Sequence, residues 1–438
     1  MRSFKSLLLV IIVLALAFGG FLILRDRTPP AITLTPASGP VSARTGILLK
    51  AEDDGAGLRS LVITASQGDR TVTLLSRDYP AGTSAVEETV SLVGDGLQDG
   101  AVELHILAAD RAYLGLGNGN RNSQTVAYSI DNKPPQVGVL SVQHNINQGG
   151  SALVAYTVSE EVTQTGVRVG DRLFPGYLQP SGVYLSLFAF PWDMEPSVFV
   201  PKVVAVDLAG NERAAGFYFH LTPKVFPTDR INISERFLAN KIVPDFQHFF
   251  PETTDPLQLF LKVNGELRRQ NLATILDYGR QTAPQKLWDG VFGAQRNAAV
   301  PGAFAQRRTY YHNEKVIDHQ THLGIDLASL AHAEVPAANA GRVIHADDLG
   351  IYGQCVIIDH GLGLQTLYGH LSQIMVKIGD DVTKGQVIGR TGTSGLAGGD
   401  HLHYDVLVAG QQVNPLEWWD ARWISHNILG KLELAGAP

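Results

Sequence analysis

Residues 398–413 read GGDHLHYDVLVAGQQV, and this stretch decides what fold to expect for the C-terminal part of the chain. A glycine-rich turn leads into the alternating run HLHYDV, and a second glycine turn follows it. Alternation between two turns is typical of a strand in an antiparallel sheet. Because residues i and i+2 of a strand point to the same face, His401 and His403 are expected to face one cleft.

The surrounding region has the same character. Short strand-like runs joined by Gly or Asp turns follow one another, among them GRVIHA, QCVIIDHG, LQTLYGHL and GQVIGRTG. The pattern predicts an antiparallel β-sheet domain at residues 303–425, followed by a tail at residues 426–438. Ten of the 14 histidines lie between His312 and His426, so any histidine chemistry is expected in this domain.

Two further groups of polar residues accompany the histidine pair. His322 and Asp326 form H-x-x-x-D in THLGIDLA, where Gly324 permits a bend that would bring their side chains together, and His370 lies in TLYGHLS. Two imidazoles and one carboxylate would leave a tetrahedral zinc with one open position, as hydrolytic sites require. Water held there becomes acidic near neutral pH, and neighbouring histidines can transfer protons. A lone histidine in a β-domain is usually structural, so only the combination is informative.

The segments HLGID, LYGHL and GGDHLHYDV together resemble the signature of lysostaphin-type zinc metallopeptidases, which include LytM-like peptidoglycan endopeptidases. The resemblance covers about residues 304–419 and includes PAANAGRVIHA and the closing VNPLEWW. The family usually has arginine after its first ligand, where this chain has Leu323, so one contact is expected to differ. The resemblance implies one zinc ion and the following roles: His322, Asp326 and His403 as zinc ligands, and His370 and His401 as catalytic histidines.

The composition excludes several other classes of protein. Apolar residues make up 45% of the 438 residues and charged residues 18%, which suits packed domains and not a disordered chain. The net charge of −7 argues against a nucleic-acid binder that works by neutralising phosphates. Cys355 is the only cysteine, so neither an intrachain disulfide nor a cysteine-rich zinc site can form.

The N-terminus contains an apolar run of eighteen uncharged residues, Leu7–Leu24. As a helix it would be about 27 Å long, close to the thickness of a membrane's hydrocarbon core. We therefore expect residues 1–27 to be a single-pass anchor in the cytoplasmic membrane, with the bulk of the chain in the periplasm or cell-wall space. A cleavable signal peptide is the alternative, since Ala15-Leu16-Ala17 resembles a cleavage site.

Two β-rich stretches follow the apolar run and look like a degenerate repeat. One opens at Pro29-Pro30 and the other at Pro134-Pro135, and each closes with a similar phrase, AADRAYLGLGNGNR or AVDLAGNER. Short alternating runs between turns predict β-sandwiches at residues 28–132 and 133–224. By this pattern both modules resemble bacterial immunoglobulin-like domains.

Residues 225–302 change to a helical period and predict a helical connector. Asp255-Pro256 has the N-cap acid and first-turn proline of a helix start, and ISERFLANKIVPDF predicts a short helix ended by Pro244. The connector is expected to pack on a neighbouring domain, with a lid over the cleft as the alternative. The predicted fold is thus mainly β: a transmembrane helix, two immunoglobulin-like modules, a helical connector and a C-terminal metallopeptidase domain.

These features predict a membrane-anchored, extracytoplasmic zinc metalloendopeptidase that hydrolyses peptide bonds in peptidoglycan stem peptides or cross-links. Its partners would be the peptidoglycan substrate and the membrane, which it contacts through the N-terminal helix; whether a regulatory protein also binds is left open. One alternative is a catalytically inactive relative that activates or scaffolds another cell-wall hydrolase. Another is a surface adhesion protein in which the β-modules do the work.

Overall fold

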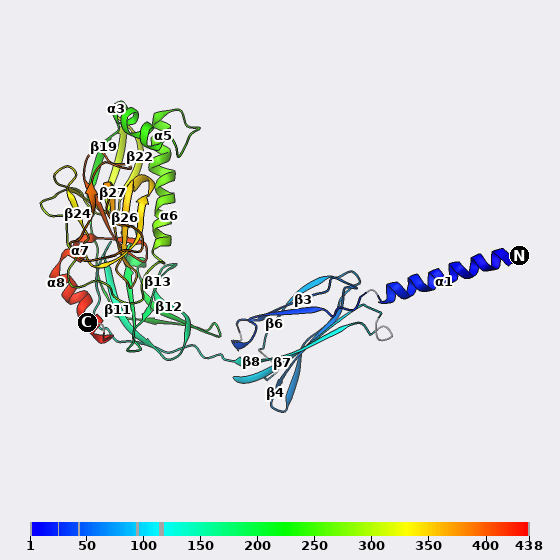
Figure 1. The fold of residues 1–438 in the computed structure, drawn as a ribbon. Helices are drawn as coiled ribbons and strands as arrows, with labels where there is room; N and C mark the ends of the chain where they lie inside the picture. Colours follow the sequence, from blue (N-terminus) through cyan, green and yellow to red (C-terminus); the bar gives the residue numbers. More distant parts are fainter. Residues whose placement is uncertain (1, 25, 43, 93–95, 114–117, 437–438) are drawn as a thin grey trace. The chain divides into compact units, whose positions relative to one another are not determined.

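The computed structural model describes residues 2–24, 26–42, 44–92, 96–113 and 118–436, and within the first helix it describes the side chains of residues 8–21. The chain is mainly β (Figure 1). It divides into two compact units: residues 1–135, 160–163 and 206–213 form the first, and the remaining residues to 438 form the second.

The first unit begins with helix α1 (Arg2–Leu24). Among the residues that the structure describes, no helix combines the length and apolarity needed to cross a membrane. Both ends of the predicted span, residue 7 and residues 22–24, have side chains outside the described part of the chain. Membrane anchoring therefore stays a prediction from the sequence.

Two sheets follow α1 in the first unit, and their pairings are antiparallel except that β2 runs parallel to β8. One sheet has the order β1-β3-β6, and the other has the order β2-β8-β7-β4-β5. Alternate residues of β3 are buried, among them Leu49, and they share a core with Ile63 of β4 and Leu104 of β7. The predicted alternation is therefore confirmed for these strands. The strands are β1 Ala31–Thr35, β2 Gly39–Val41, β3 Ile47–Glu52, β4 Leu58–Gln67, β5 Arg70–Asp78, β6 Ala85–Val90, β7 Gly100–Asp110 and β8 Arg121–Ile130.

The second β-rich stretch again forms two sheets, here of four strands each. Their orders are β14-β15-β11-β9 and β13-β12-β16-β17, and β10 and β18 form a separate parallel pair. The sequence of strand β11, SALVAYTV, is mostly apolar, and the strand is accordingly buried along most of its length. The strands are β9 Val137–Val139, β10 Asn145–Asn147, β11 Ser151–Val158, β12 Val162–Val169, β13 Arg172–Pro175, β14 Tyr177–Leu178, β15 Tyr184–Ala189, β16 Lys202–Asp207, β17 Glu212–Gly216 and β18 His220–Thr222.

The predicted connector contains helices but begins and ends with strands, β19 (Thr228–Asn232) and β20 (Ala299–Gly302). The expectation that Pro244 ends the first helix is wrong. The helix runs from α3 (Glu235–Phe237) through a π-helical turn into α4 (Val243–Phe246). Proline interrupts an α-helix because it lacks an N–H and its ring meets the preceding turn. Here the wide π turn just before Pro244 has already altered the α-helical ladder, so the helix continues.

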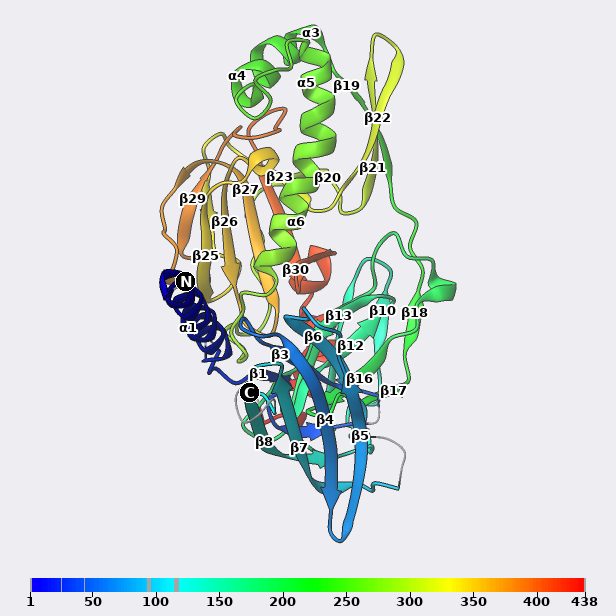
Figure 2. The same cartoon turned by 90° about the vertical axis from the view of Figure 1, so that its right-hand side faces the viewer.

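The second connector helix begins as predicted. Asp255 Oδ1 accepts hydrogen bonds from the backbone N–H groups of Leu257 (2.8 Å) and Gln258 (3.4 Å), and Pro256 occupies the first turn of α5 (Pro256–Lys262). A second π-helical turn leads into α6 (Arg268–Tyr278). In both views α6 lies along the large C-terminal sheet (Figures 1 and 2).

The C-terminal region is built on a ten-stranded sheet. Seven of its strands follow the order β20-β23-β30-β27-β26-β25-β28, and the other three, β24, β29 and β31, pair beside this row. A separate hairpin, β21–β22, pairs with β19 in parallel. The elements are β21 Gln306–His312, β22 Lys315–His322, β23 Ile325–Ala328, β24 Glu334–Pro336, β25 Gly341–Asp348, β26 Gln354–Asp359, β27 Leu364–Ile374, β28 Asp381–Val382, β29 Val387–Thr391, β30 Leu402–Val408, β31 Gln411–Val413, α7 Pro415–Trp419, α8 Ala421–Ile424 and α9 Gly430–Leu434.

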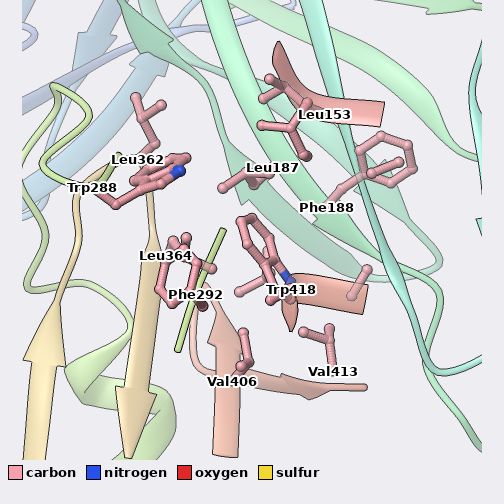
Figure 3. Packing of buried hydrophobic residues seen from close by; sticks show 14 of the residues in the cluster. Leu153, Leu187, Phe188, Trp288, Phe292, Leu362, Leu364, Val406, Val413 and Trp418 are labelled. Carbon is pink, nitrogen blue, oxygen red and sulfur yellow. The ribbon is translucent and has the colours of Figure 1, made fainter. Parts of the chain in front are cut away.

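One hydrophobic core joins this sheet to the second β-module. Leu153 and Leu187 of the module lie close to Trp418, which also packs against Phe292 at a ring-centroid distance of 5.3 Å (Figure 3). Burying a tryptophan side chain completely removes well over 100 Å² of apolar surface from water. The module and the sheet therefore stabilise each other, since separating them would expose this core.

His360 makes the stability of the second unit depend on pH. The side chain is fully buried, with its ring bonded to Ala340 O (2.7 Å) and Thr366 Oγ1 (2.8 Å), and burial lowers its pKa to about 4. The unfolded chain, with a histidine pKa near 6.5, takes up the proton first. This contribution to stability is therefore present above pH 6.5 and is lost as the pH falls towards 4.

Between pH 7 and pH 5 His360 should reduce the free energy of unfolding by about 2 kcal/mol. Urea unfolding of the full chain, followed by tryptophan fluorescence at both pH values, measures the change. In the His360→Gln variant the decrease should be smaller by that amount, because all other groups titrate equally in both chains. An equal decrease in the two chains would contradict the prediction.

Candidate metal centre

Three strands bring the predicted ligands together. His322 is the last residue of β22, Asp326 lies in β23, and His403 lies in β30. In the antiparallel β23–β30 ladder Asp326 pairs directly with His403, so the two side chains are cross-strand neighbours. Gly324, between the two ligands of the H-x-x-x-D motif, lets the chain pass close to His403 and Asp405.

The ligand atoms form a nearly equilateral triangle. His322 Nε2 lies 2.9 Å from Asp326 Oδ1 and 3.0 Å from His403 Nδ1, and His403 Nδ1 lies 3.0 Å from Asp326 Oδ1. Bonds of 2.0–2.1 Å to a tetrahedral zinc would place such atoms about 3.3 Å apart. All three residues are buried, and the donor set of two imidazoles and one carboxylate suits zinc. A small expansion of the triangle would admit the ion.

The outer nitrogen of each ligand histidine is already engaged. His322 Nδ1–H donates to Ala303 O (3.0 Å), and His403 Nε2 lies 2.9 Å from Asp405 Oδ1, an ion-pair contact. The bond to Ala303 O places the His322 proton on Nδ1 and leaves Nε2 for the metal, while the Asp405 carboxylate favours a proton on Nε2 of His403. The arrangement of carboxylate, histidine and metal site is the one expected of a zinc centre.

The two predicted catalytic histidines lie beside the triangle. The rings of His370 and His401 are 4.8 Å apart, and His401 Nε2 is 3.4 Å from Asp326 Oδ1. His370 Nδ1–H donates to Ser394 O and His401 Nδ1–H donates to Gly399 O, both at 2.8 Å. Nδ1 is thus bonded in both residues, which leaves Nε2 of His370 for proton transfer and places Nε2 of His401 beside Asp326.

Burial and charge act against each other in this cluster. Burial lowers the pKa of His322, and it lowers the pKa of His370 well below the usual range with the help of neighbouring His401. Burial alone would raise the pKa of Asp326, but the charge and hydrogen bonds of His322 and its neighbours hold that pKa well below 3.8. Asp326 thus remains an ionised carboxylate, as a metal ligand must be.

The sequence prediction missed two residues that contact the ligands. Asp405, fully buried, lies 2.9 Å from His403 Nε2, and a signal for it was present because His403 and Asp405 are two residues apart on one face of β30. Arg308 donates from Nη2 to Asp326 Oδ2 (2.9 Å). It comes from β21, and nothing in its local sequence connects it with the ligands.

Gly324 is needed for the space that it leaves. A Cβ atom at this position would lie 2.1 Å from Asp405 Oδ1 and 2.7 Å from His403 Nε2. Any larger residue would therefore displace Asp405 and the predicted ligand His403. The predicted bend is only part of the reason for this glycine.

The cluster lies at the bottom of a cleft of about 640 Å³. The glycine-rich loop before His401 forms one wall, which Gly398 and Gly399 line. The connector forms the opposite side with Phe237 and Phe260. Lys241 of the connector donates to Thr393 O in the glycine-rich loop. The connector is thus part of the cleft wall.

Two other acidic groups lie in the first unit, Asp26–Asp53–Asp110 and Asp131–Glu160–Asp207. Their carboxylates accept hydrogen bonds from their own turns: Asp110 Oδ1 from two backbone N–H groups, and Asp207 from Asn211. These bonds account for the clusters as turn structure, and neither contains a histidine. The described residues thus offer one group of mixed histidine and carboxylate ligands.

Residues 320–415 match the model of Peptidase family M23, and they are an M23 domain of the LytM-like type. The chain is 41% identical over 95 residues to the DD-carboxypeptidase/endopeptidase Mpg of Neisseria meningitidis serogroup B, which covers 22% of each protein. It is 36% identical over 118 residues to the peptidoglycan DD-endopeptidase ShyA of Vibrio cholerae, covering 27% of each.

A third relative has a different role in its name. The chain is 39% identical over 95 residues to the murein hydrolase activator EnvC of Escherichia coli K12, which covers 22% of this chain and 23% of EnvC. Among solved structures, a putative peptidase M23 from Pseudomonas aeruginosa is 20% identical, with a TM-score of 0.40 over 63% of this chain and 94% of that one. The chain spans about a quarter of the length of these curated relatives.

Replacing Asp405 by asparagine should weaken zinc binding by about 10- to 100-fold, because it removes the negative charge that lies 2.9 Å from His403 Nε2 and strengthens the imidazole as a ligand. Competition with a chromophoric chelator measures the affinity. Asp347→Asn, the same change at an exposed position of β25, is the matched control. Equal affinity of the Asp405→Asn chain and the wild type would show that Asp405 does not support the metal.

Proposed function

We propose that this protein is a zinc metalloendopeptidase that hydrolyses peptide bonds in peptidoglycan stem peptides or cross-links. The observation that carries the proposal is the triangle of His322, Asp326 and His403, with ligand atoms 2.9–3.0 Å apart in a cleft shared with two further histidines. The names of the relatives Mpg and ShyA support the choice of peptidoglycan as substrate.

The residues of the cleft would divide the work. His322, Asp326 and His403 would hold a zinc ion, which, when bound, acidifies a water molecule and polarises the scissile carbonyl. His370 and His401 present Nε2 to the cleft with their rings fixed by backbone carbonyls, so either can accept a proton and return it to the leaving amine. Phe237 and Phe260 of the connector exclude water from one side of the bound peptide.

An activator of another cell-wall hydrolase is the second candidate function, because EnvC is among the relatives. It differs from the enzyme in one respect that can be measured. An activator needs the cleft as a binding surface only, whereas an endopeptidase needs the three ligands and both proton-transferring histidines. The presence of all five side chains in one cleft favours the enzyme.

Location outside the cytoplasm is part of the same proposal. It rests on the apolar run at residues 7–24 and on the site of the proposed substrate, and residues 1–27 would then serve as the membrane anchor. Fractionation of cells that express the tagged full chain tests this. Recovery of the chain with the cytoplasmic proteins would refute the location.

The enzyme proposal is tested on purified cell-wall sacculi. The zinc-loaded full chain should release new amino groups, and a chelator should stop the release. His403→Ala should lose stoichiometric zinc and activity together, since one of three ligands is gone. His105→Ala, at an exposed position of the first unit, is the control and should behave as the wild type. Stoichiometric zinc without any release of amino groups would favour the activator.

His370→Ala separates proton transfer from metal binding. This variant should retain zinc, because His370 is not one of the three ligands, while kcat should fall by about 10²- to 10⁴-fold. Zinc content and kcat are measured on the same preparation. A kcat equal to that of the wild type would remove His370 from the mechanism.

A further inference from the structure

A second hollow of about 480 Å³ adjoins the metal cleft, and three arginines are among its lining residues. The two hollows lie side by side, since they share the lining residues Arg268, Leu272, Arg308, Thr321 and Leu323. Arg307 lines the second hollow only. A peptide that lies across the metal site can therefore extend past these arginines.

The guanidinium of Arg268 is held in a defined position. It donates from Nε to Asn264 O (3.0 Å) and from Nη2 to Asn264 Oδ1 (2.7 Å). Asn264 in turn donates to Asp318 Oδ2 (2.7 Å), which also accepts from the side-chain amide of Gln320. Arg268 is thus positioned by a neutral amide and keeps its positive charge for the hollow.

The other two arginines differ in what they contact. Arg308 is mostly buried and bonds Asp326 Oδ2 with Nη2, which places its charge at the junction of the two hollows. Arg307 is exposed, and within the described residues its side chain makes no hydrogen bond or ion pair. Asp193 is the acidic residue among the described residues that line the second hollow, and because Arg308 is already paired with Asp326, the guanidinium groups of Arg268 and Arg307 are the two there without a carboxylate partner.

The far wall of this hollow comes from the second β-module. Trp192 lines it, and the loop that carries Trp192 is fixed because Gln148 Nε2 donates to the carbonyl oxygens of Trp192 (3.0 Å) and Met194 (3.1 Å). The module thus contributes a surface to the path and does more than act as a spacer.

We propose that the arginine-lined hollow is a subsite that binds a free carboxylate of the peptide substrate, so that the protein selects acidic peptides. The proposal rests on the proposed function, because it takes the occupant of the cleft to be a peptide. Guanidinium groups bind carboxylates through paired, charge-assisted hydrogen bonds, and partly buried arginines do so better than exposed ones. Arg268 and Arg307 are the specificity-determining residues, and Arg308 joins the subsite to the metal ligands.

Binding is measured first, because it does not depend on turnover. The probes are a cross-linked muropeptide prepared from sacculi and the same muropeptide with its carboxylates converted to methylamides. Isothermal titration uses the zinc-loaded full chain carrying His370→Ala, in which cleavage should be about 10²- to 10⁴-fold slower. The native muropeptide should bind about tenfold more tightly than the amidated one, since a hydrogen bond to a charged group contributes roughly that factor or more. The preference should shrink at high salt.

Two variants locate the preference. Arg307→Gln and Arg268→Gln should each reduce the tenfold preference to about threefold or less. Arg269→Gln, an exposed neighbour on α6 that lines neither hollow, is the matched control and should retain it. The exposed Arg307 side chain makes no hydrogen bond or ion pair with the described residues, so its replacement keeps the test valid even if Arg268→Gln impairs folding.

The outcomes separate this proposal from the proposed function. Equal binding of the two muropeptides by the parent chain, or a preference that Arg307→Gln leaves intact, would overturn the subsite. A carboxylate preference that disappears in Arg307→Gln supports the subsite whether or not the wild type cleaves sacculi. Cleavage of sacculi without any carboxylate preference would leave the enzyme standing and remove the subsite.

Discussion

The pairing of Asp326 with His403 across the β23–β30 ladder is the constraint on which the rest of the site depends. It places a carboxylate and an imidazole within 3.0 Å of each other on buried strands, where neither can move without breaking the sheet. The register also determines the neighbours, because β27 pairs with β30 on its other side and brings Gly369 opposite His403, so that His370 follows directly. A shift of one residue in β30 would turn His403 to the opposite face.

Around this pair, each imidazole has one nitrogen bonded outward and one left inward. Ala303, Ser394 and Gly399 supply backbone carbonyls for this purpose, and Asp405 supplies the carboxylate. The free-energy cost of orienting the histidine rings when a metal binds is therefore small, because the surrounding backbone has already fixed the rings. The positive φ of His370 (61°) is a strained backbone conformation for a residue other than glycine, and the β27 strand and the carbonyl of Ser394 hold it there.

The sequence could predict that these five side chains meet in one cleft because its signals are local, and their roles stay a prediction. The H-x-H spacing, the H-x-x-x-D spacing and the glycine turns each determine geometry over a few residues, and the resemblance supplied the roles. Arg308 could not be predicted in this way, because its contact with Asp326 depends on how the β21–β22 hairpin lies against β23. The continuation of the first connector helix through Pro244 was equally hidden, since a π turn leaves no clear mark in the composition.

The shared core around Trp418 has a consequence for how this chain can be divided. The indole ring of Trp418 belongs to the core shared by strand β11 and the C-terminal sheet. Glu417 beside it accepts hydrogen bonds from the side chain of Asn147 (2.7 Å) and the backbone amide of Ser151 (2.9 Å). A fragment that begins at β22, the strand that ends with His322, would expose this hydrophobic core to solvent. The smallest autonomous piece of the molecule therefore starts ahead of β9, well upstream of the boundary that sequence similarity suggests.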